Sequence, residues 1–101
     1  VILPSTLRTI SRGVFWKCKS LKKITIPASV ETIGEYAFFH CDSLKHVYNY
    51  STEPQPLSVI FNRKDITIHV PAASVEKYRK AQHWRDMNIV AMRDEEIMDE
   101  R

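Results

Sequence analysis

Cys18 and Cys41 are the side chains best suited to carry chemistry, and they lie 23 positions apart. No C-x-x-C pair and no paired histidine spacing accompanies them, so a zinc site has little support. A disulfide would need the two residues in neighbouring turns of a repeat. Two side chains that point in parallel fit its torsion badly, so we expect free, buried thiols that pack as small hydrophobic residues.

Histidine, serine and acidic side chains form no catalytic grouping in this sequence. The four histidines share no motif, and although a histidine can act as a pH switch, we expect surface residues: His40, His46, His69 and His83. No serine lies in a G-x-S-x-G elbow, and the acids are not paired across a plausible cleft. The sequence therefore predicts a protein that is not an enzyme and that needs no metal or cofactor.

Basic side chains gather at the start of the chain. The net charge of +3 comes from 15 Lys and Arg against 12 Asp and Glu. Residues 1–25 contain six bases and no acid, which gives a candidate basic patch: Arg8, Arg12, Lys17, Lys19, Lys22 and Lys23. Such a patch can attract an anionic glycan, nucleic acid or an acidic protein. Charge runs are usually solvated faces, so glycan binding is an alternative and nucleic acid is not favoured.

Length and composition describe one globular domain of 101 residues, of which 44% are hydrophobic and 27% charged. No apolar run approaches the roughly 18 residues that a membrane-spanning helix needs, so we expect no membrane insertion.

An internal repeat determines how these residues are positioned. When the chain is offset by 23, residues 3–25 lie over residues 26–48, and eight of the 23 pairs are identical: Pro4/Pro27, Thr9/Thr32, Ile10/Ile33, Phe15/Phe38, Cys18/Cys41, Ser20/Ser43, Leu21/Leu44 and Lys22/Lys45. A period of roughly 20–29 residues is typical of leucine-rich repeats, in which stacked coils bury a continuous core.

One copy of the repeat predicts a strand, a turn and a short helical segment. Ile24 and Ile26 share one face of a strand, by the period of two, and Pro27 ends it. Gly34 would permit a conformation that a Cβ resists, and residues 35–39 are long enough for one helical turn. We expect a sheet that includes residues 22–26, 45–48 and 67–70, with Phe15 and Phe38 stacked in the core.

The segment ITIPASVETIGEYAFFHCDSLKHV closely resembles the repeat of BspA-like bacterial surface proteins. The resemblance covers residues 1–50 as about two repeats, although Ser11 replaces the family's Gly and Val14 its Ala. It implies an α/β fold, a right-handed leucine-rich-repeat solenoid, and an extracellular or cell-surface location. Because the chain opens inside a repeat, we expect it to be part of a longer protein.

After Tyr50 the period stops, and residues 51–92 predict a strand–helix–strand cap. The strand covers residues 66–70, the helix runs from 72 to about 82, and a last strand covers 89–92. This half resembles the C-terminal segment that follows such repeats in surface proteins of gut Bacteroidetes. The acidic residues 93–101 are expected to form a frayed tail.

The solvent side of the strand sheet is the predicted binding face, which consists of Lys23, Thr25, His46, Tyr48 and His69. We expect a non-catalytic, adhesin-like module that binds a host or microbial surface protein. A purely structural cap is the alternative. Trp16 and Phe39 could belong to a binding face, although packing against a neighbouring coil is favoured. Apolar residues near the N-terminus predict self-association through that end.

Overall fold

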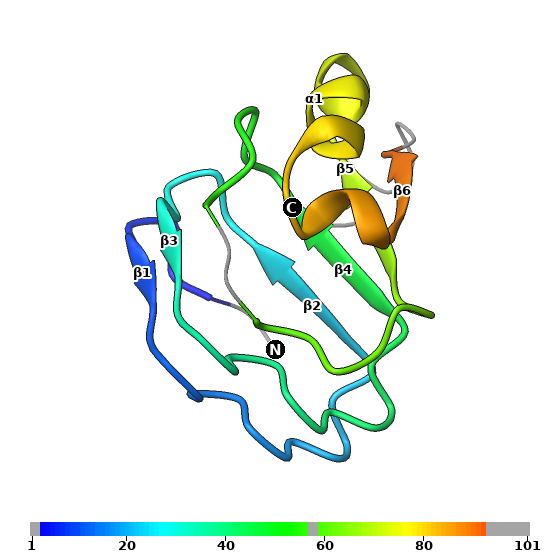
Figure 1. Ribbon diagram of the computed structural model, residues 1–101. Helices are drawn as coiled ribbons and strands as arrows, with labels where there is room; N and C mark the ends of the chain where they lie inside the picture. Colours follow the sequence, from blue (N-terminus) through cyan, green and yellow to red (C-terminus); the bar gives the residue numbers. More distant parts are fainter. Residues whose placement is uncertain (1–2, 57–58, 93–101) are drawn as a thin grey trace.

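The computed structural model describes residues 3–56 and 59–92 and shows a mixed α/β fold built on parallel strands (Figure 1). Four strands, β2, β4, β5 and β6, form one sheet in that order, and β1 pairs with β3 in a second, two-stranded sheet. The strands are β1 (Thr9–Ile10), β2 (Lys23–Ile26), β3 (Thr32–Ile33), β4 (His46–Asn49), β5 (Thr67–Val70) and β6 (Asn88–Ala91). Three short helices follow β5, namely η1 (Ala72–Ser74), α1 (Val75–Lys80) and η2 (Trp84–Asp86).

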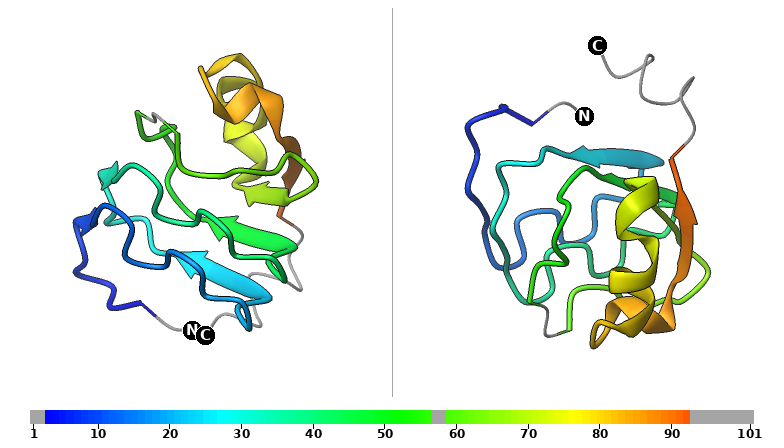
Figure 2. Two further views of the ribbon diagram at one scale, coloured as in Figure 1. Left: turned by 60° about the horizontal axis from the view of Figure 1, so that its bottom comes forward. Right: turned by 90° about the horizontal axis from the view of Figure 1, so that it is seen from above.

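The 23-residue spacing is the register of the structure. Thr9 pairs with Thr32, and Ile24 pairs with Val47. The intervening turn segments are joined in the same way, since the Phe15 amide donates to the Ala37 carbonyl at 2.9 Å. Figure 2 (left) shows these segments running side by side in successive layers. Each layer therefore hydrogen-bonds to the next along both its strands and its turns.

Alternation of side chains explains the four-stranded sheet. In β2 the even positions, Ile24 and Ile26, are buried, and in β4 Val47 is buried between exposed His46 and half-buried Tyr48. The predicted sheet is confirmed, because its three expected segments coincide with β2, β4 and β5 to within one residue at either end.

Phenylalanine rings form a continuous column through the core. The rings of Phe15 and Phe38 lie 5.4 Å apart and are 3° from parallel, which confirms the predicted stack. Phe61, a further 23 residues along, stacks on Phe38 at 5.5 Å. The column thus extends one layer past Tyr50, where the sequence pattern stops.

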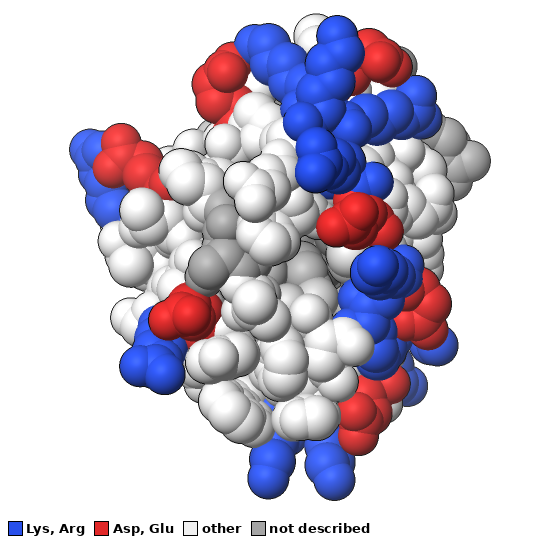
Figure 3. Space-filling view, viewed as in Figure 1, with Lys and Arg blue, Asp and Glu red and all other residues white. Residues whose placement is uncertain are grey.

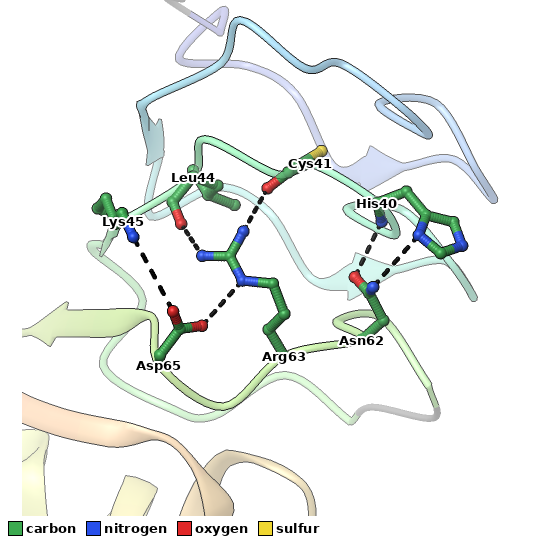
Figure 4. Close-up of polar contacts among 7 residues, drawn as sticks. All are labelled: His40, Cys41, Leu44, Lys45, Asn62, Arg63 and Asp65. Atoms are coloured by element: carbon green, nitrogen blue, oxygen red, sulfur yellow. Dashed lines mark hydrogen bonds and ion pairs between the residues drawn. The ribbon is translucent and has the colours of Figure 1, made fainter.

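The third layer is two residues shorter than the second, since Val47 pairs with Ile68, 21 positions later. Arg63 lies at this shortening (Figure 4). Its guanidinium donates to the carbonyl oxygen of Cys41 at 2.8 Å and to that of Leu44 at 2.6 Å. Its Nε donates to Asp65, a bond that lowers the pKa of that carboxyl group. One side chain therefore satisfies two carbonyl groups of the layer below it.

The expected helical turn over residues 35–39 is wrong, because this segment consists of consecutive turns. Tyr36 and His40 have left-handed backbone angles, with φ of 60° and 59°, and such residues interrupt a right-handed helix. Gly34 is required for a different reason from the expected one. A Cβ at Gly34 would lie 2.4 Å from the backbone nitrogen of Arg12, so the glycine permits close approach of two layers.

The predicted helix over residues 72–82 is present but shorter, as η1 followed by α1. Its residues Tyr78 and, beyond it, Trp84 are fully buried. The Tyr78 hydroxyl donates to the Ser51 carbonyl at 2.7 Å, and the Trp84 indole N–H donates to the Gln55 carbonyl at 2.9 Å. The Gln55 side chain in turn bonds Asn49 and the carbonyl of Val30. These bonds attach the helical segment to the second and third layers.

Replacing Phe38 by alanine should break the aromatic column at its centre. Loss of a buried aromatic side chain costs about 3–5 kcal/mol, a large part of the total stability of a small domain, roughly 5–15 kcal/mol. We expect a largely unfolded or insoluble variant by thermal denaturation. Val14→Ala, at an exposed residue of the first layer, is the matched control. A Phe38→Ala midpoint within a few degrees of the parent would contradict this role.

Replacing Arg63 by alanine should destabilise the shortened layer. The carbonyl group of Leu44 would lose the donor that Arg63 supplies, whereas that of Cys41 would keep the Leu44 amide. We expect a cost of about 1–3 kcal/mol from the half-buried carbonyl that loses this bond. Arg63→Lys should recover little of this, because an ammonium group lacks the planar pair of donors. The free energy of unfolding in urea measures both, with exposed Lys64→Ala as the control. Equal stability of Arg63→Ala and Lys64→Ala would refute the assignment.

Candidate functional site

The five residues of the predicted binding face lie together on three adjacent strands. Lys23 pairs with His46 across β2 and β4, and Thr25 pairs with Tyr48. Tyr48 pairs in turn with His69 of β5. We call these residues, Lys23, Thr25, His46, Tyr48 and His69, the strand face. They alternate along their strands with the buried residues Ile24, Val47 and Ile68, so strand geometry directs them away from the core.

Three rings form the centre of the strand face. The ring nitrogens His46 Nδ1 and His69 Nε2 lie 2.9 Å apart and share a hydrogen bond. The edge of Tyr48 contacts His69, with ring centroids 4.2 Å apart. His69 is only 7% exposed, so the expectation that it is a surface histidine is wrong, because the rings of His46 and Tyr48 lie against it. His40 and His46 are exposed.

A groove of about 480 Å³ adjoins the strand face where β2 and β4 begin. Its lining includes three lysines and a single acid: Lys22, Lys23, Asp42, Ser43, Lys45 and His46. Lys23 and His46 thus belong to both the groove and the strand face. An acidic group bound in this groove would meet mainly positive side chains.

The six residues of the predicted basic patch do not share one face. Arg8, next to β1, forms an ion pair with Glu31 at 3.3 Å, and the Arg12 guanidinium lies 5.6 Å from the centre of the Tyr36 ring. Lys22 and Lys23 lie at β2, which belongs to the other sheet. Lys19 joins these two lysines along a groove of about 610 Å³ that also includes Phe15 and Leu21. The local sequence cluster is therefore divided by the fold.

A second group of bases lies on α1 and was missed by sequence reasoning. Lys77, Arg79 and Lys80 occupy its last turn and are exposed, and Figure 3 shows basic side chains gathered over this helix at the top. Lys77 contacts Glu53, and Arg79 contacts Glu76. Residues 76–101 also contain many acids and have a net negative charge. A charge count over that whole stretch therefore did not reveal the basic cluster on α1.

Both cysteines are free thiols, but the expected burial holds for Cys41 alone, since Cys18 is only half-buried. Cys41 is buried, and its S–H donates to the Phe15 carbonyl oxygen at 3.0 Å. Burial raises the pKa of this thiol above its ordinary value, which keeps it protonated and unreactive. Within residues 3–56 and 59–92, no group of three or more His, Cys, Asp or Glu side chains is arranged to bind a metal ion.

The family model described as the BspA type leucine rich repeat region, with six copies, matches residues 1–78. The chain belongs to the BspA-type leucine-rich repeat family. No curated protein matches it. The match continues past Tyr50, through β5 and into α1, the stretch in which the parallel ladder continues at a spacing of 21. The boundary expected after residue 50, between the repeats and the cap, marks a change in the sequence pattern. That it is also a limit between domains stays a prediction.

Membership of the BspA-type family indicates a protein-interaction module. None of the helices in the described part of this BspA-type chain is long and apolar enough to cross a bilayer. The acidic segment 93–101 lies outside the described residues, as do Val1 and Ile2. Leu3 and Pro4 are described and are not part of a strand.

Alkaline pH should destabilise the protein through Tyr78. Burial, with a smaller effect of nearby Glu53, raises the pKa of this phenol above its ordinary value of about 10. Above that pH the unfolded state loses the proton first, so it binds fewer protons than the folded state and the free energy of unfolding falls as pH rises. Urea unfolding between about pH 8 and pH 11 measures the slope.

Tyr78→Phe is the matched variant for this measurement. It loses the bond to Ser51 and should be less stable at neutral pH by about 1 kcal/mol. Its stability should then fall less steeply than that of the parent above about pH 10. All other side chains are the same in both proteins, so the difference between the two curves isolates Tyr78. Parallel curves would show that this phenol does not contribute.

Proposed function

We propose that this chain is a non-catalytic, adhesin-like interaction module of a cell-surface or secreted leucine-rich-repeat protein, and that it binds a surface protein through the strand face. The observation that carries the proposal is the packed group of His46, Tyr48 and His69, which spans β4 and β5 on the side of the sheet away from the core. Family membership supports the interaction role.

The chemistry of the strand face suits a protein surface. Tyr48 is rigid and amphipathic, and such a ring adds contact area at a small cost in conformational entropy. Lys23 and His46 are exposed at one end of the face and can meet acidic groups of a partner. The contact between buried His69 and Tyr48 holds the ring in place before binding, which lowers the entropy lost on association.

We also propose that the layers form a right-handed solenoid and that residues 51–92 cap it. Several contacts support the cap. Within the segment, Ser74, Tyr78 and Trp84 bond to carbonyl groups of Thr52, Ser51 and Gln55. The segment is joined to the second layer by β5, which pairs with β4, and by Gln55, which bonds Asn49 and the carbonyl of Val30. In addition, β6 pairs with β5 at the end of the sheet. Trp84 and Tyr78 pack edge to face at 5.2 Å and cover apolar residues of the last layer.

Two alternatives keep specific support from the grooves at the other end of the sheet. One alternative is an anionic glycan, bound by Lys19, Lys22 and Lys23. The other is a second copy of the chain, which would pack on Phe15 and Leu21 in the same groove and pair with the edge of β2. Sedimentation at several protein and salt concentrations tests self-association. Retention on heparin that falls steeply with salt is the expected sign of glycan binding.

The strand face is tested by labelling the chain and probing an array of purified host-matrix and bacterial-surface proteins. The variant Lys23→Glu/His46→Ala changes two exposed residues of the face, whereas Lys64→Glu/Lys80→Glu changes exposed residues elsewhere. We expect the first to weaken binding at least about tenfold, or about 1.4 kcal/mol, and the second to leave it unchanged. Equal binding by the face variant and the parent, or binding to heparin alone, would overturn the proposal.

A further inference from the structure

An exposed aromatic cluster lies on the turn segments, apart from the strand face. Its members are Trp16 from the first layer and Tyr36, Phe39 and His40 from the second, with Arg12 beside them. We call these five residues the turn-face cluster. The exposed large hydrophobic side chains of the described residues are Val14, Trp16 and Val59, and all three are on turn segments.

The rings of the turn-face cluster contact one another across the two layers. The Trp16 ring lies 5.5 Å from Tyr36, 6.0 Å from Phe39 and 6.3 Å from His40, measured between centroids. Tyr36 and Phe39 meet edge to face at 5.1 Å. Trp16 nevertheless stays 45% exposed. The rings of Tyr36, Phe39 and His40 hold the Trp16 indole in place, and a large part of the indole surface remains open to a partner.

The backbone at Tyr36 is the second observation. Tyr36 has φ of 60°, and the residue 23 positions earlier, Gly13, has φ of 62° in the same place of the repeat. Glycine adopts this left-handed conformation freely, whereas a bulky residue is strained in it. The second layer therefore keeps a tyrosine at a position where glycine would be easier. Lys17 and His40, which are also 23 positions apart, have φ of 61° and 59°, so left-handed residues recur at fixed places of the repeat. At Tyr36 this conformation presents the ring to Trp16.

The surroundings of the cluster indicate the charge of its partner. Arg12 lies over the Tyr36 ring, and exposed Lys17 follows Trp16 directly. Exposed Glu35, which precedes Tyr36, is an acidic neighbour, so the two bases outnumber this acid. Trp, Tyr and Arg are the residue types that dominate binding energy in protein interfaces. Basic side chains around an apolar centre are complementary to acidic residues around an apolar anchor. Trp16 is tilted by 58° and 52° against Tyr36 and Phe39 and contacts both, so the rings leave no slot between them for a flat ligand.

We propose that the turn-face cluster is a second interaction surface, which binds an acidic polypeptide segment. An apolar side chain of that segment packs on Trp16, and its carboxylates pair with Arg12 and Lys17. This surface shares no residue with the strand face, so the proposal goes beyond the function given above and does not depend on it. A module with two surfaces can contact two partners, or two parts of one partner, at the same time.

The two tryptophans make the proposal measurable. Trp84 is fully buried and Trp16 is exposed, so quenching of the red-shifted emission reports on Trp16. The probe is a phage library of random twelve-residue peptides, selected on the parent chain with counter-selection on Trp16→Ala. We expect enriched peptides with Asp or Glu on both sides of an aromatic residue or leucine. As synthetic peptides they should change the Trp16 emission and saturate it.

Variants separate binding from folding. Tyr36→Gly removes the ring but suits the left-handed backbone, so we expect its thermal midpoint to stay within a few degrees of the parent while peptide affinity falls at least about tenfold. Arg12→Glu should weaken binding to a similar extent and make it less sensitive to salt. Val14→Ala, Lys80→Glu and the strand-face variant Lys23→Glu/His46→Ala should bind the peptides as the parent does.

Four results would overturn the proposal. One is a selection without enrichment of acidic residues, and another is equal affinity of the peptides for the parent and Arg12→Glu. The third is a change of Trp16 emission with heparin but with none of the peptides, which would assign the cluster to a sulfated glycan. Loss of peptide binding in the strand-face variant alone would place the peptide site on the strand face instead. If no protein of the array binds through the strand face but the peptides bind the turn-face cluster, only the proposed function of the strand face is refuted.

Discussion

The column of Phe15, Phe38 and Phe61 is the constraint on which the rest of the structure depends. Ring centroids 5.4 and 5.5 Å apart can be maintained only if each layer of chain returns to the same place above the last. That requirement sets the 23-residue register of β1 with β3 and of β2 with β4. It also explains why Gly34 must lack a side chain, since the backbone of the first layer passes close to it at Ser11 and Arg12. Strand pairing and aromatic stacking thus stabilise one another.

Where the layer length changes, side chains replace backbone donors. The third layer reaches its strand two residues early, and Arg63 bonds the carbonyl groups of Cys41 and Leu44 at that point. On the opposite side, buried Asn49 and Gln55 bond each other and connect the second layer to Trp84. Buried polar groups are costly unless they are hydrogen-bonded. These two networks therefore allow the shortened third layer to follow the 23-residue second layer while the carbonyl groups and amides named here stay hydrogen-bonded.

The two candidate surfaces differ in what supports them. On the strand face, side chains stand on regular strands, and their positions follow from alternation along β2, β4 and β5. On the turn face, left-handed residues direct the rings, and the spacing of Trp16 and Tyr36 follows from contact between two layers. A protein-interaction scaffold gains from both arrangements, because rigid side chains lose little freedom on binding.

The sequence by itself determined the repeat, the strands β2, β4 and β5, the Phe15–Phe38 stack and the family, because identities at one offset and alternation along a strand are local or periodic signals. It also placed the five strand-face residues on adjacent strands. Tertiary structure alone decided that His69 is buried against Tyr48 and that the basic residues of the first layer are separated, with Arg8 beside β1 of one sheet and Lys22 and Lys23 at β2 of the other. Arg63 as a carbonyl partner was equally hidden, whereas Phe61 keeps the 23-residue spacing and was obscured only because the residues around it do not match the repeat. The positions of His69 and Arg63 depend on contacts between layers of unequal length, and a fixed period cannot show where a deletion moves the chain.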